Sequence, residues 1–414
     1  MKTGEYVLYK ELLQIISNIP FYEDVVLKDK MNLQDELKAK KIFQSLPIID
    51  RGIMQKDLSS FLIRSFSRTK ISEILSDKLE TTNDYQIFIN GKEYWIEYTS
   101  GTTGMPLTII KSVNERICLG INLWKMRCSF SKVTPNEMFC FIHHGNDSYP
   151  FPFDFIENYE VRKRKELRYL QAKSYKWWHI FPAQLEVYSK YAKFFDNSQG
   201  KLEVIEYNGA SVLECDKKRY ETLFNCKLAN NYGCREVWNI AYSCSNNKLH
   251  VNEDNIILEL VDEDGEIINE SGIVGEIVVT SRNLSTMPFI RYKIGDYGYY
   301  EEGMCKCMSR SRVICLDNKR RIIAGTNICG TELFRTVIME LDRYEGINKF
   351  EAINIFQKNY EEFIVNIKQC KENKIILQNK FTQIANDRIG TKCRFFFEYN
   401  DNKVYKSLFS TKMM

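Results

Sequence analysis

The sequence lacks any long hydrophobic run, and it lacks an excess of charge of one sign. No stretch approaches the roughly 18 consecutive apolar residues of a membrane-spanning helix, so we expect no membrane insertion. The 58 basic and 54 acidic residues are interleaved and leave a net charge of +4, which argues against a general nucleic-acid binder. Glu5, Lys10 and Glu11 interrupt the first apolar residues, so no export signal is visible and we expect a cytoplasmic protein.

Cysteine, by contrast, is plentiful. Without an export signal, the 13 cysteines are expected to be thiols or metal ligands in a reducing compartment rather than disulfides. The densest basic run, Arg162–Lys165, is short, and we expect it to be a solvent-exposed helix face rather than a binding patch. Trp177 and Trp178 are expected in the core, and His179 is expected to serve packing more than chemistry.

The spacing of apolar residues predicts an α/β protein. It is helical up to Pro20 and again after Pro47, and it changes to the period of a strand from Tyr85. Residues 113–260 then mix helices with short apolar strands, which is an α/β pattern. A chain of 414 residues also exceeds what one core usually serves, so two domains or more are expected.

The later part of the chain predicts two further regions. Residues 256–300 alternate like antiparallel β-structure, and their acidic turn Asp262–Gly265 fits a hairpin better than a calcium loop, because the later ligand positions are missing. The last ~95 residues alternate strand-like and helical runs, which predicts a small α+β domain.

The most informative segment runs from Tyr98 to Leu107. Gly101 and Gly104 let the backbone turn tightly and direct N–H groups at an anion, and the hydroxyl residues around them add donors. A Walker A loop is excluded because its lysine and its spacing are absent. Composition alone leaves a phosphate-binding loop and a simple hairpin turn equally open.

Further motifs decide between these alternatives. The loop resembles the phosphate loop of adenylate-forming enzymes, the superfamily of acyl-CoA synthetases and peptide-synthetase adenylation domains. The closest branch is that of phenylacetate–CoA ligase and its CapK-like relatives, which Pro20–Tyr22 and Leu46–Ile48 also resemble. Three more segments follow in the family's order: Asn208–Ser211, Asn231–Glu236 and Met287–Asp296.

The resemblance implies a role for each matching residue. Glu236 would bind Mg²⁺, Tyr232 would stack on adenine beside Gly233, and Asp296 would accept hydrogen bonds from the ribose hydroxyls. It also implies a large N-terminal domain over residues 1–317, with mixed sheets and a β-rich region, and a small α+β lid over 318–414. The phosphate contacts would come from Ser100, Gly101, Thr102, Thr103 and Gly104, and the remaining adenine contacts from Gly209, Ala210 and Ser211.

A second constellation has the donors of a metal site. Cys244 and His250 lie in one short segment, and Cys305 and Cys307 follow about 55 residues later. Three thiols and an imidazole match structural Zn²⁺ with no open coordination position, although Cys-x-Cys is tighter than the usual spacing. Similar positions in the phenylacetate–CoA ligase branch favour zinc over accidental proximity.

The chain also departs from the family's pattern. Met105 replaces a common lysine, and Arg235 replaces a common threonine, where its fixed cation would contact phosphate or carboxylate. The interdomain hinge is degenerate at Asp317–Arg321. Lys403, after Asn402, is the best match to the catalytic lysine, while Lys406 and Lys412 remain alternatives.

The implied activity is ATP-dependent activation of a small carboxylic acid through an acyl-adenylate, followed by transfer to the thiol of coenzyme A. Aromatic residues at 139–181 favour an aromatic or modest-sized acid. The alternatives are transfer to an amine or a carrier-protein thiol, or a non-catalytic nucleotide-binding scaffold. Whether the chain forms a homodimer is left open.

Overall fold

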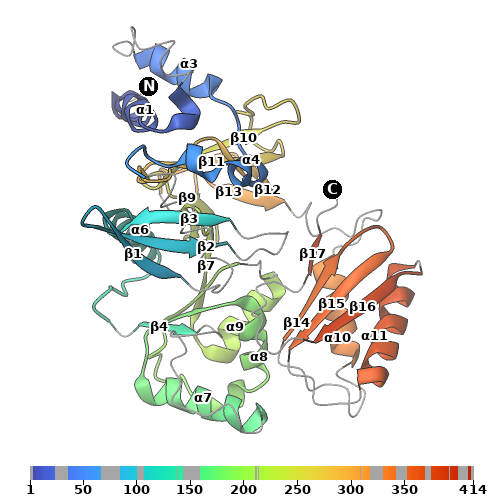
Figure 1. The fold of residues 1–414 in the computed structure, drawn as a ribbon. Helices are drawn as coiled ribbons and strands as arrows, with labels where there is room; N and C mark the ends of the chain where they lie inside the picture. Colours follow the sequence, from blue (N-terminus) through green and yellow to red (C-terminus); the bar gives the residue numbers. More distant parts are fainter. Residues whose placement is uncertain are drawn as a thin grey trace. The chain divides into compact units, whose positions relative to one another are not determined.

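Helices and strands alternate along the chain of the computed structural model (Figure 1). Contacts divide it into unit 1, residues 1–126, 233–242 and 248–315, and unit 2, residues 127–232, 243–247 and 316–414. Each unit is therefore built from segments that are distant in sequence. The structure describes residues 3–23, 36–66, 84–99, 107–137, 139–142, 159–209, 212, 214–307, 309–317, 330–341, 352–368, 374–390, 392–399 and 409–411.

Unit 1 begins with short helices that share a small core. Leu12 and Ile16 of the first helix pack with Phe43 of the next one and with Ile290 from much later in the chain. Pro20 opens a 3-10 turn, where its missing N–H costs nothing. The predicted helical region is confirmed where it is described. Its elements are α1 (Thr3–Ile16), η1 (Pro20–Tyr22), α3 (Glu36–Ser45), α4 (Arg51–Lys56) and η3 (Leu58–Phe61).

A three-stranded antiparallel sheet and a long helix follow in unit 1. The sheet has the order β1-β2-β3. A capping box starts the helix: Glu115 accepts from the Ser112 N–H at 2.6 Å, and Ser112 Oγ accepts from the Glu115 N–H at 3.3 Å. The elements are β1 (Tyr85–Ile89), β2 (Lys92–Tyr98), β3 (Thr108–Ser112) and α6 (Val113–Phe130).

A second antiparallel sheet completes unit 1. Its order is β10-β11-β12-β13, and the antiparallel β-structure predicted for residues 256–300 is confirmed in β10, β11 and β12. The turn at Asp262–Gly265 leads back from β10, and Gly265 takes a φ of +85°, so it is a hairpin turn. The strands are β10 (Ile256–Val261), β11 (Gly275–Ser281), β12 (Tyr292–Tyr300) and β13 (Ile314–Asp317).

Unit 2 contains the parallel part of a six-stranded sheet of order β4-β5-β6-β7-β8-β9. Cys140, Trp178, Ile205 and Leu228 of successive strands pack on one face with the helices that follow them. Trp177 and Trp178 are fully buried, as expected. The elements are β4 (Phe139–Ile142), α7 (Tyr159–Lys173), β5 (Trp177–Ile180), α8 (Pro182–Ser189), η4 (Ala192–Phe194), β6 (Val204–Tyr207), α9 (Glu214–Phe224), β7 (Lys227–Cys234), β8 (Trp238–Ser243) and β9 (Leu249–Val251).

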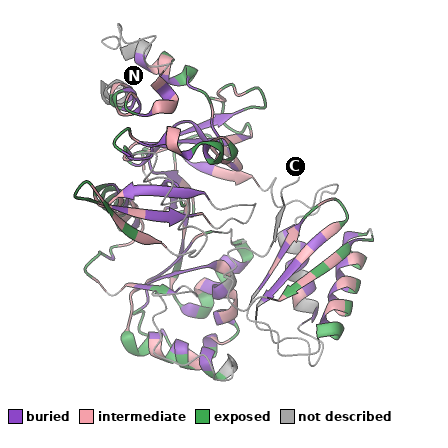
Figure 2. Cartoon of the chain, in the orientation of Figure 1, coloured by how far each residue is buried: buried purple, intermediate pink, exposed green. Residues whose placement is uncertain are grey.

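The C-terminal residues form their own four-stranded sheet, of order β16-β15-β14-β17. Two helices cover one face of it, where Phe334, Phe363 and Phe381 share a core (Figures 1 and 2). A large N-terminal α/β region with a β-rich part and a small α+β C-terminal domain are thus confirmed. The elements are α10 (Gly330–Leu341), β14 (Ala352–Gln357), β15 (Glu362–Lys368), α11 (Lys374–Ile389), β16 (Arg394–Tyr399) and β17 (Phe409–Thr411).

Two further expectations concern the domain boundary and membrane-spanning helices. The domain boundary at residue 317 stays a prediction, and residues 318–329, with most of the degenerate hinge, lie outside the described residues. Among the described residues, no helix combines the length and apolarity needed to cross a membrane.

The prediction for the basic run Arg162–Lys165 is wrong in part, because Arg162 and Lys163 are buried. Their positions lie on the face of α7 that packs toward the sheet. Glu166, one turn later, compensates their charge: Lys163 Nζ donates to it at 2.9 Å and the Tyr188 hydroxyl at 2.8 Å. The run is therefore partly a core feature.

The centre of unit 2 holds a buried carboxylate, Glu206. Arg127 donates to its two oxygens at 2.8 Å each, His179 Nδ1 lies 2.5 Å away, and Asn231 donates at 3.0 Å. Burial alone raises the pKa of Glu206, but Arg127 and His179 outweigh burial and hold it well below its usual value. Glu206 thus joins strands β5, β6 and β7 through charge-assisted hydrogen bonds.

We predict that Glu206→Gln destabilises the protein by about 3–5 kcal/mol at pH 7, because Arg127 loses its buried countercharge. The folded pKa is depressed, so this stability is fully present above the unfolded pKa of about 4.3 and is lost as the pH falls below it. Urea unfolding at pH 7 and at lower pH measures both effects. Asp254→Asn is the control, since Asp254 pairs with Lys125 with both side chains more than half exposed; equal shifts for the two variants would contradict the prediction.

Candidate functional site

The predicted phosphate loop is the connection between two antiparallel strands. Tyr98 at the end of β2 pairs with Thr108 at the start of β3. The Thr99 N–H donates to the Leu107 carbonyl at 3.1 Å, and the Leu107 N–H donates to Thr99 Oγ1 at 2.8 Å. These bonds close the stem of the loop. Residues 100–106, with the predicted contacts Ser100, Gly101, Thr102, Thr103 and Gly104, lie outside the described residues.

A tight reversal between β7 and β8 carries Arg235 and Glu236. Its geometry depends on Gly233, where an added Cβ would lie 1.7 Å from the Trp238 carbonyl oxygen. No side chain fits at that distance, so the chain can close here only with glycine. The glycine of the Tyr-Gly-x-x-Glu pattern is therefore a structural requirement of the turn as well as part of a motif.

Arg235 is fixed at the entrance to the loop stem. Its Nη2 donates to both carboxylate oxygens of Asp84 at 2.7 Å, and its Nε donates to the Tyr98 carbonyl at 3.4 Å. Its own carbonyl accepts from Lys111 Nζ at 2.8 Å. The structure thus brings the Arg235 motif to the strand that leads directly into the predicted phosphate loop.

A buried ion pair next to Arg235 joins β2 and β3. Lys111 donates to Glu97 at 2.8 Å, and both side chains are essentially inaccessible. Burial raises the pKa of Glu97, but Lys111, Arg235 and Arg116 together lower it by more than burial raises it, so the carboxylate stays ionised. The Trp238 indole also donates to Glu97, at 3.4 Å. This network ties both strands of the loop stem to the turn.

Glu236, the predicted Mg²⁺ ligand, is buried and hydrogen-bonded to a second motif. The Tyr292 hydroxyl donates to its Oε1 at 3.0 Å. Burial and the neighbouring Glu236 carboxylate raise the pKa of Tyr292, so the hydroxyl keeps its proton and remains a donor. Arg291, beside Tyr292, instead bonds Glu259 and the Leu46 carbonyl and serves packing.

Asp296 lies on an irregular part of β12. The register with β11 shifts between Glu276 and Val278, and Gly295 takes a φ of +78°. Such a bulge changes the direction of a side chain relative to a regular strand. The predicted ribose ligand is therefore placed by a local departure from the pleat.

The predicted adenine residues belong to unit 2. Gly209, directly after β6, has a φ of +78°, and Tyr232 is half-buried near the end of β7. Asn208, directly before Gly209, has a buried Oδ1 with no hydrogen-bond partner among the described residues. Ala210, Ser211 and the catalytic candidates Lys403, Lys406 and Lys412 lie outside the described residues.

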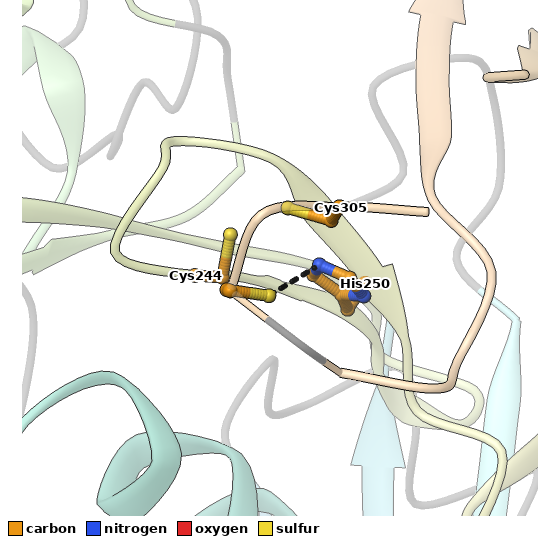
Figure 3. A group of neighbouring side chains, drawn as sticks. Cys244, His250 and Cys305 are labelled. Carbon is orange, nitrogen blue, oxygen red and sulfur yellow. Dashed lines mark hydrogen bonds between the residues drawn. The ribbon is translucent and has the colours of Figure 1, made fainter. Parts of the chain in front are cut away.

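The predicted metal ligands form one cluster. Figure 3 labels three of them, Cys244, His250 and Cys305. The ligand atoms of Cys244, His250, Cys305 and Cys307 all lie within 4.8 Å of one another. His250 Nε2 faces Cys307 Sγ at 3.2 Å. In a tetrahedral zinc site with bonds of about 2.0–2.3 Å, the donors are roughly 3.3–3.8 Å apart, so the cluster needs little adjustment to hold an ion.

Outer contacts orient this cluster. His250 Nδ1 lies 2.9 Å from the Ser311 carbonyl, which fixes the ring and leaves Nε2 directed at the sulfurs. The N–H groups of Asn246 and Ser309 donate to Cys244 and Cys307 at 3.4 and 3.5 Å. These contacts help to fix the directions of the two sulfurs.

Sequence reasoning missed the residues that support these motifs. Asp84 lies outside every motif, and Lys111 and Glu97 read as ordinary members of alternating strands. Their partners are distant in sequence, so no local spacing could have indicated them.

Comparisons with known proteins give a likeness in fold. No protein-family model matches the sequence, and no curated protein matches it. Among solved structures, 2-hydroxyisobutyryl-CoA ligase with 2-HIB-AMP and CoA in the thioesterification state aligns over 100% of this chain and 91% of its own, with a TM-score of 0.60 and 13% identity. Its open conformation aligns over 97% and 90%, with a TM-score of 0.56 and 13% identity.

A more distant likeness is to the fatty acyl-adenylate ligases from E. coli and L. pneumophila, with a TM-score of 0.50 and 14% identity over 75% of this chain and 66% of that one. At these identities the likeness concerns the fold. The chain has the fold of adenylate-forming acyl-CoA ligases.

Proposed function

We propose that the protein activates a carboxylic acid with ATP and transfers the acyl group to the thiol of coenzyme A. The observation that carries this proposal is the direct bonding of three motifs within unit 1. Arg235 and Lys111 join the turn to the phosphate-loop stem, and Tyr292 joins it to the β12 motif. The fold likeness to 2-hydroxyisobutyryl-CoA ligase, solved with an acyl-adenylate and CoA, supports the same activity.

The proposed reaction has two steps. A carboxylate oxygen attacks the α-phosphorus of ATP, the bond to the β-phosphate oxygen breaks, and pyrophosphate leaves. The thiolate of coenzyme A then attacks the acyl carbon and releases AMP. A bound Mg²⁺ would offset phosphate charge during the first step. Lys403 is proposed to stabilise the charge of the leaving pyrophosphate.

The residues that the motifs assign have the chemistry that each part of a nucleotide needs. Asn208 offers an unsatisfied buried acceptor beside Gly209, suited to an amino group such as that of adenine. Glu236 offers a carboxylate for Mg²⁺, and Asp296 one for ribose hydroxyls. Phosphate contacts are assigned to the loop at 100–104, and the cation of Arg235 to the α-phosphate or the substrate carboxylate.

The acid is proposed to be aromatic or of modest size, as in the phenylacetate–CoA ligase and CapK-like branch. Phe139, Phe141 and His179 lie on the sheet face opposite the helix-covered core, and Phe141 is 45% exposed. An accessible aromatic side chain there gives a flat apolar surface for an acyl group.

The cysteine–histidine cluster is proposed to hold a structural Zn²⁺. Four donors from two chain segments would fasten β9 to the loop before β13 without leaving an open coordination position. The ion's role would be to fasten the β-rich region, not to take part in the chemistry.

ATP–pyrophosphate exchange with a panel of aryl, amino and short-chain acids tests the first step. One acid or a few related acids should stimulate exchange, and the same acids should form a thioester with coenzyme A. Transfer to an amine or a carrier protein, but not to coenzyme A, would replace the second step. ATP binding without exchange for any acid would favour a non-catalytic scaffold.

Glu236→Gln should lower the exchange rate by roughly 100-fold or more, because the Mg²⁺ that neutralises phosphate charge contributes several kcal/mol. Glu263→Gln is the matched control, since that glutamate is exposed on the β10–β11 turn. Comparable rates for the two variants would remove Glu236 from the proposed site.

Arg235→Gln should raise the KM for ATP or for the acid by about 10-fold, the effect of losing one charge-assisted hydrogen bond. Steady-state exchange with each substrate varied in turn identifies which anion it contacts. The exposed Arg168 provides the control variant Arg168→Gln. An unchanged KM for both substrates would confine Arg235 to pairing with Asp84.

Purified protein should contain about one zinc ion per chain by elemental analysis, and Cys307→Ser should lose most of it, because one ligand of the tetrahedron is removed. Cys315→Ser should retain the metal, since Cys315 is outside the cluster. Absence of zinc from protein purified without chelators would exclude the assignment.

A further inference from the structure

The turn that carries Glu236 ends on a residue in an unfavourable conformation. Trp238, the first residue of β8, has a φ of +63°. Bulky side chains rarely adopt this left-handed conformation, and it persists only where surrounding contacts enforce it. The contacts that enforce it here are therefore informative.

A buried amide holds the backbone on both sides of Trp238. Asn255, 1% exposed, donates from Nδ2 to the Val237 carbonyl at 2.8 Å and to the Asn239 carbonyl at 2.7 Å. Asn255 is itself fixed, since its N–H bonds the Asn252 carbonyl at 2.9 Å. One side chain thus bridges the carbonyls of the two residues on either side of the strained residue.

Other contacts of Trp238 act in the same direction. Its carbonyl fills the space that Gly233 leaves open on the opposite strand. Its indole donates to Glu97 at 3.4 Å and lies against the guanidinium of Arg116. Val237, which follows Glu236, is therefore held through its carbonyl. Trp238 is held through both its backbone and its ring.

We propose that Asn255 and Trp238 are positioning residues that hold the Glu236 carboxylate ready for Mg²⁺–ATP. Asn255 acts through the Val237 peptide, which directly follows Glu236, and Trp238 maintains the backward bend of the chain at that point. Pre-set ligand geometry lowers the cost of ordering the site when the metal nucleotide binds. This inference rests on the proposed role of Glu236.

The test compares Asn255→Ala with Asn252→Ala. Asn252 is buried to a similar degree and belongs to the same amide network, but it bonds Asn239 Oδ1 and the Asn122 carbonyl, not the carbonyls of the turn. Binding of Mn²⁺–ATP, followed by electron paramagnetic resonance, requires no turnover. Asn255→Ala should weaken this binding by about 10-fold, while Asn252→Ala should weaken it less than 2-fold at a similar loss of melting temperature.

A double-variant cycle separates positioning from general stability. Glycine adopts a positive φ freely, so Trp238→Gly removes the strain that Asn255 restrains. The fold-change in the Kd for Mn²⁺–ATP that Asn255→Ala causes should therefore be less than half as large in the Trp238→Gly background as in the parent protein. If Asn255→Ala does not fold, Asn255→Leu, of similar volume and without the donors, replaces it.

Equal Mn²⁺–ATP binding by the Asn255 and Asn252 variants, or additive effects in the cycle, would overturn the inference. ATP–pyrophosphate exchange by the parent protein is measured independently of Mn²⁺–ATP binding. Normal Mn²⁺–ATP binding without exchange for any acid would refute the proposed activity while leaving the positioning result valid. Absence of Mn²⁺–ATP binding by the parent protein would refute both.

Discussion

The close approach of the Trp238 carbonyl to Gly233 is the constraint on which the candidate site depends. It forces the chain to reverse within four residues, and so sets Arg235 and Glu236 on a turn too short to move independently. Arg235 contacts Asp84 and Tyr98, and Glu236 contacts Tyr292. All of these contacts depend on the position of that turn. A short reversal locked by backbone packing places charged groups more accurately than a long loop would.

Buried charge in this protein is compensated close to where it arises. Glu97 is matched by Lys111 in unit 1, and Glu206 by Arg127 in unit 2. Isolated buried charges are costly, whereas paired ones define a single arrangement of the strands that carry them. Glu97 on β2 and Glu206 on β6 each lie on a strand that leads into a predicted nucleotide loop, so a buried ion pair stands near the base of each loop.

Sequence patterns were sufficient for the larger features of the fold. Local periodicity identified the α/β region, the antiparallel strands at 256–300 and the α+β C-terminal domain. The hydrogen bond between Tyr292 and Glu236 joins two motifs that sequence patterns identified only as separate segments. The residues that support the motifs could not be predicted from local sequence patterns. Asp84 meets Arg235 across 151 positions, and Asn255 acts on a backbone whose strain no side-chain pattern reveals. Local charge density also misplaced Arg162 and Lys163, which Glu166 allows to be buried.

The discontinuous construction of unit 1 has a consequence for its synthesis. The helices α1 and α3 pack on Ile290, and the Tyr22 hydroxyl reaches the Ile290 carbonyl across 268 positions. At a translation rate of roughly 5–20 residues per second, those helices wait on the order of 13–54 s for their partner. During that interval their apolar faces are exposed on the nascent chain, so this segment is where a chaperone would be needed first.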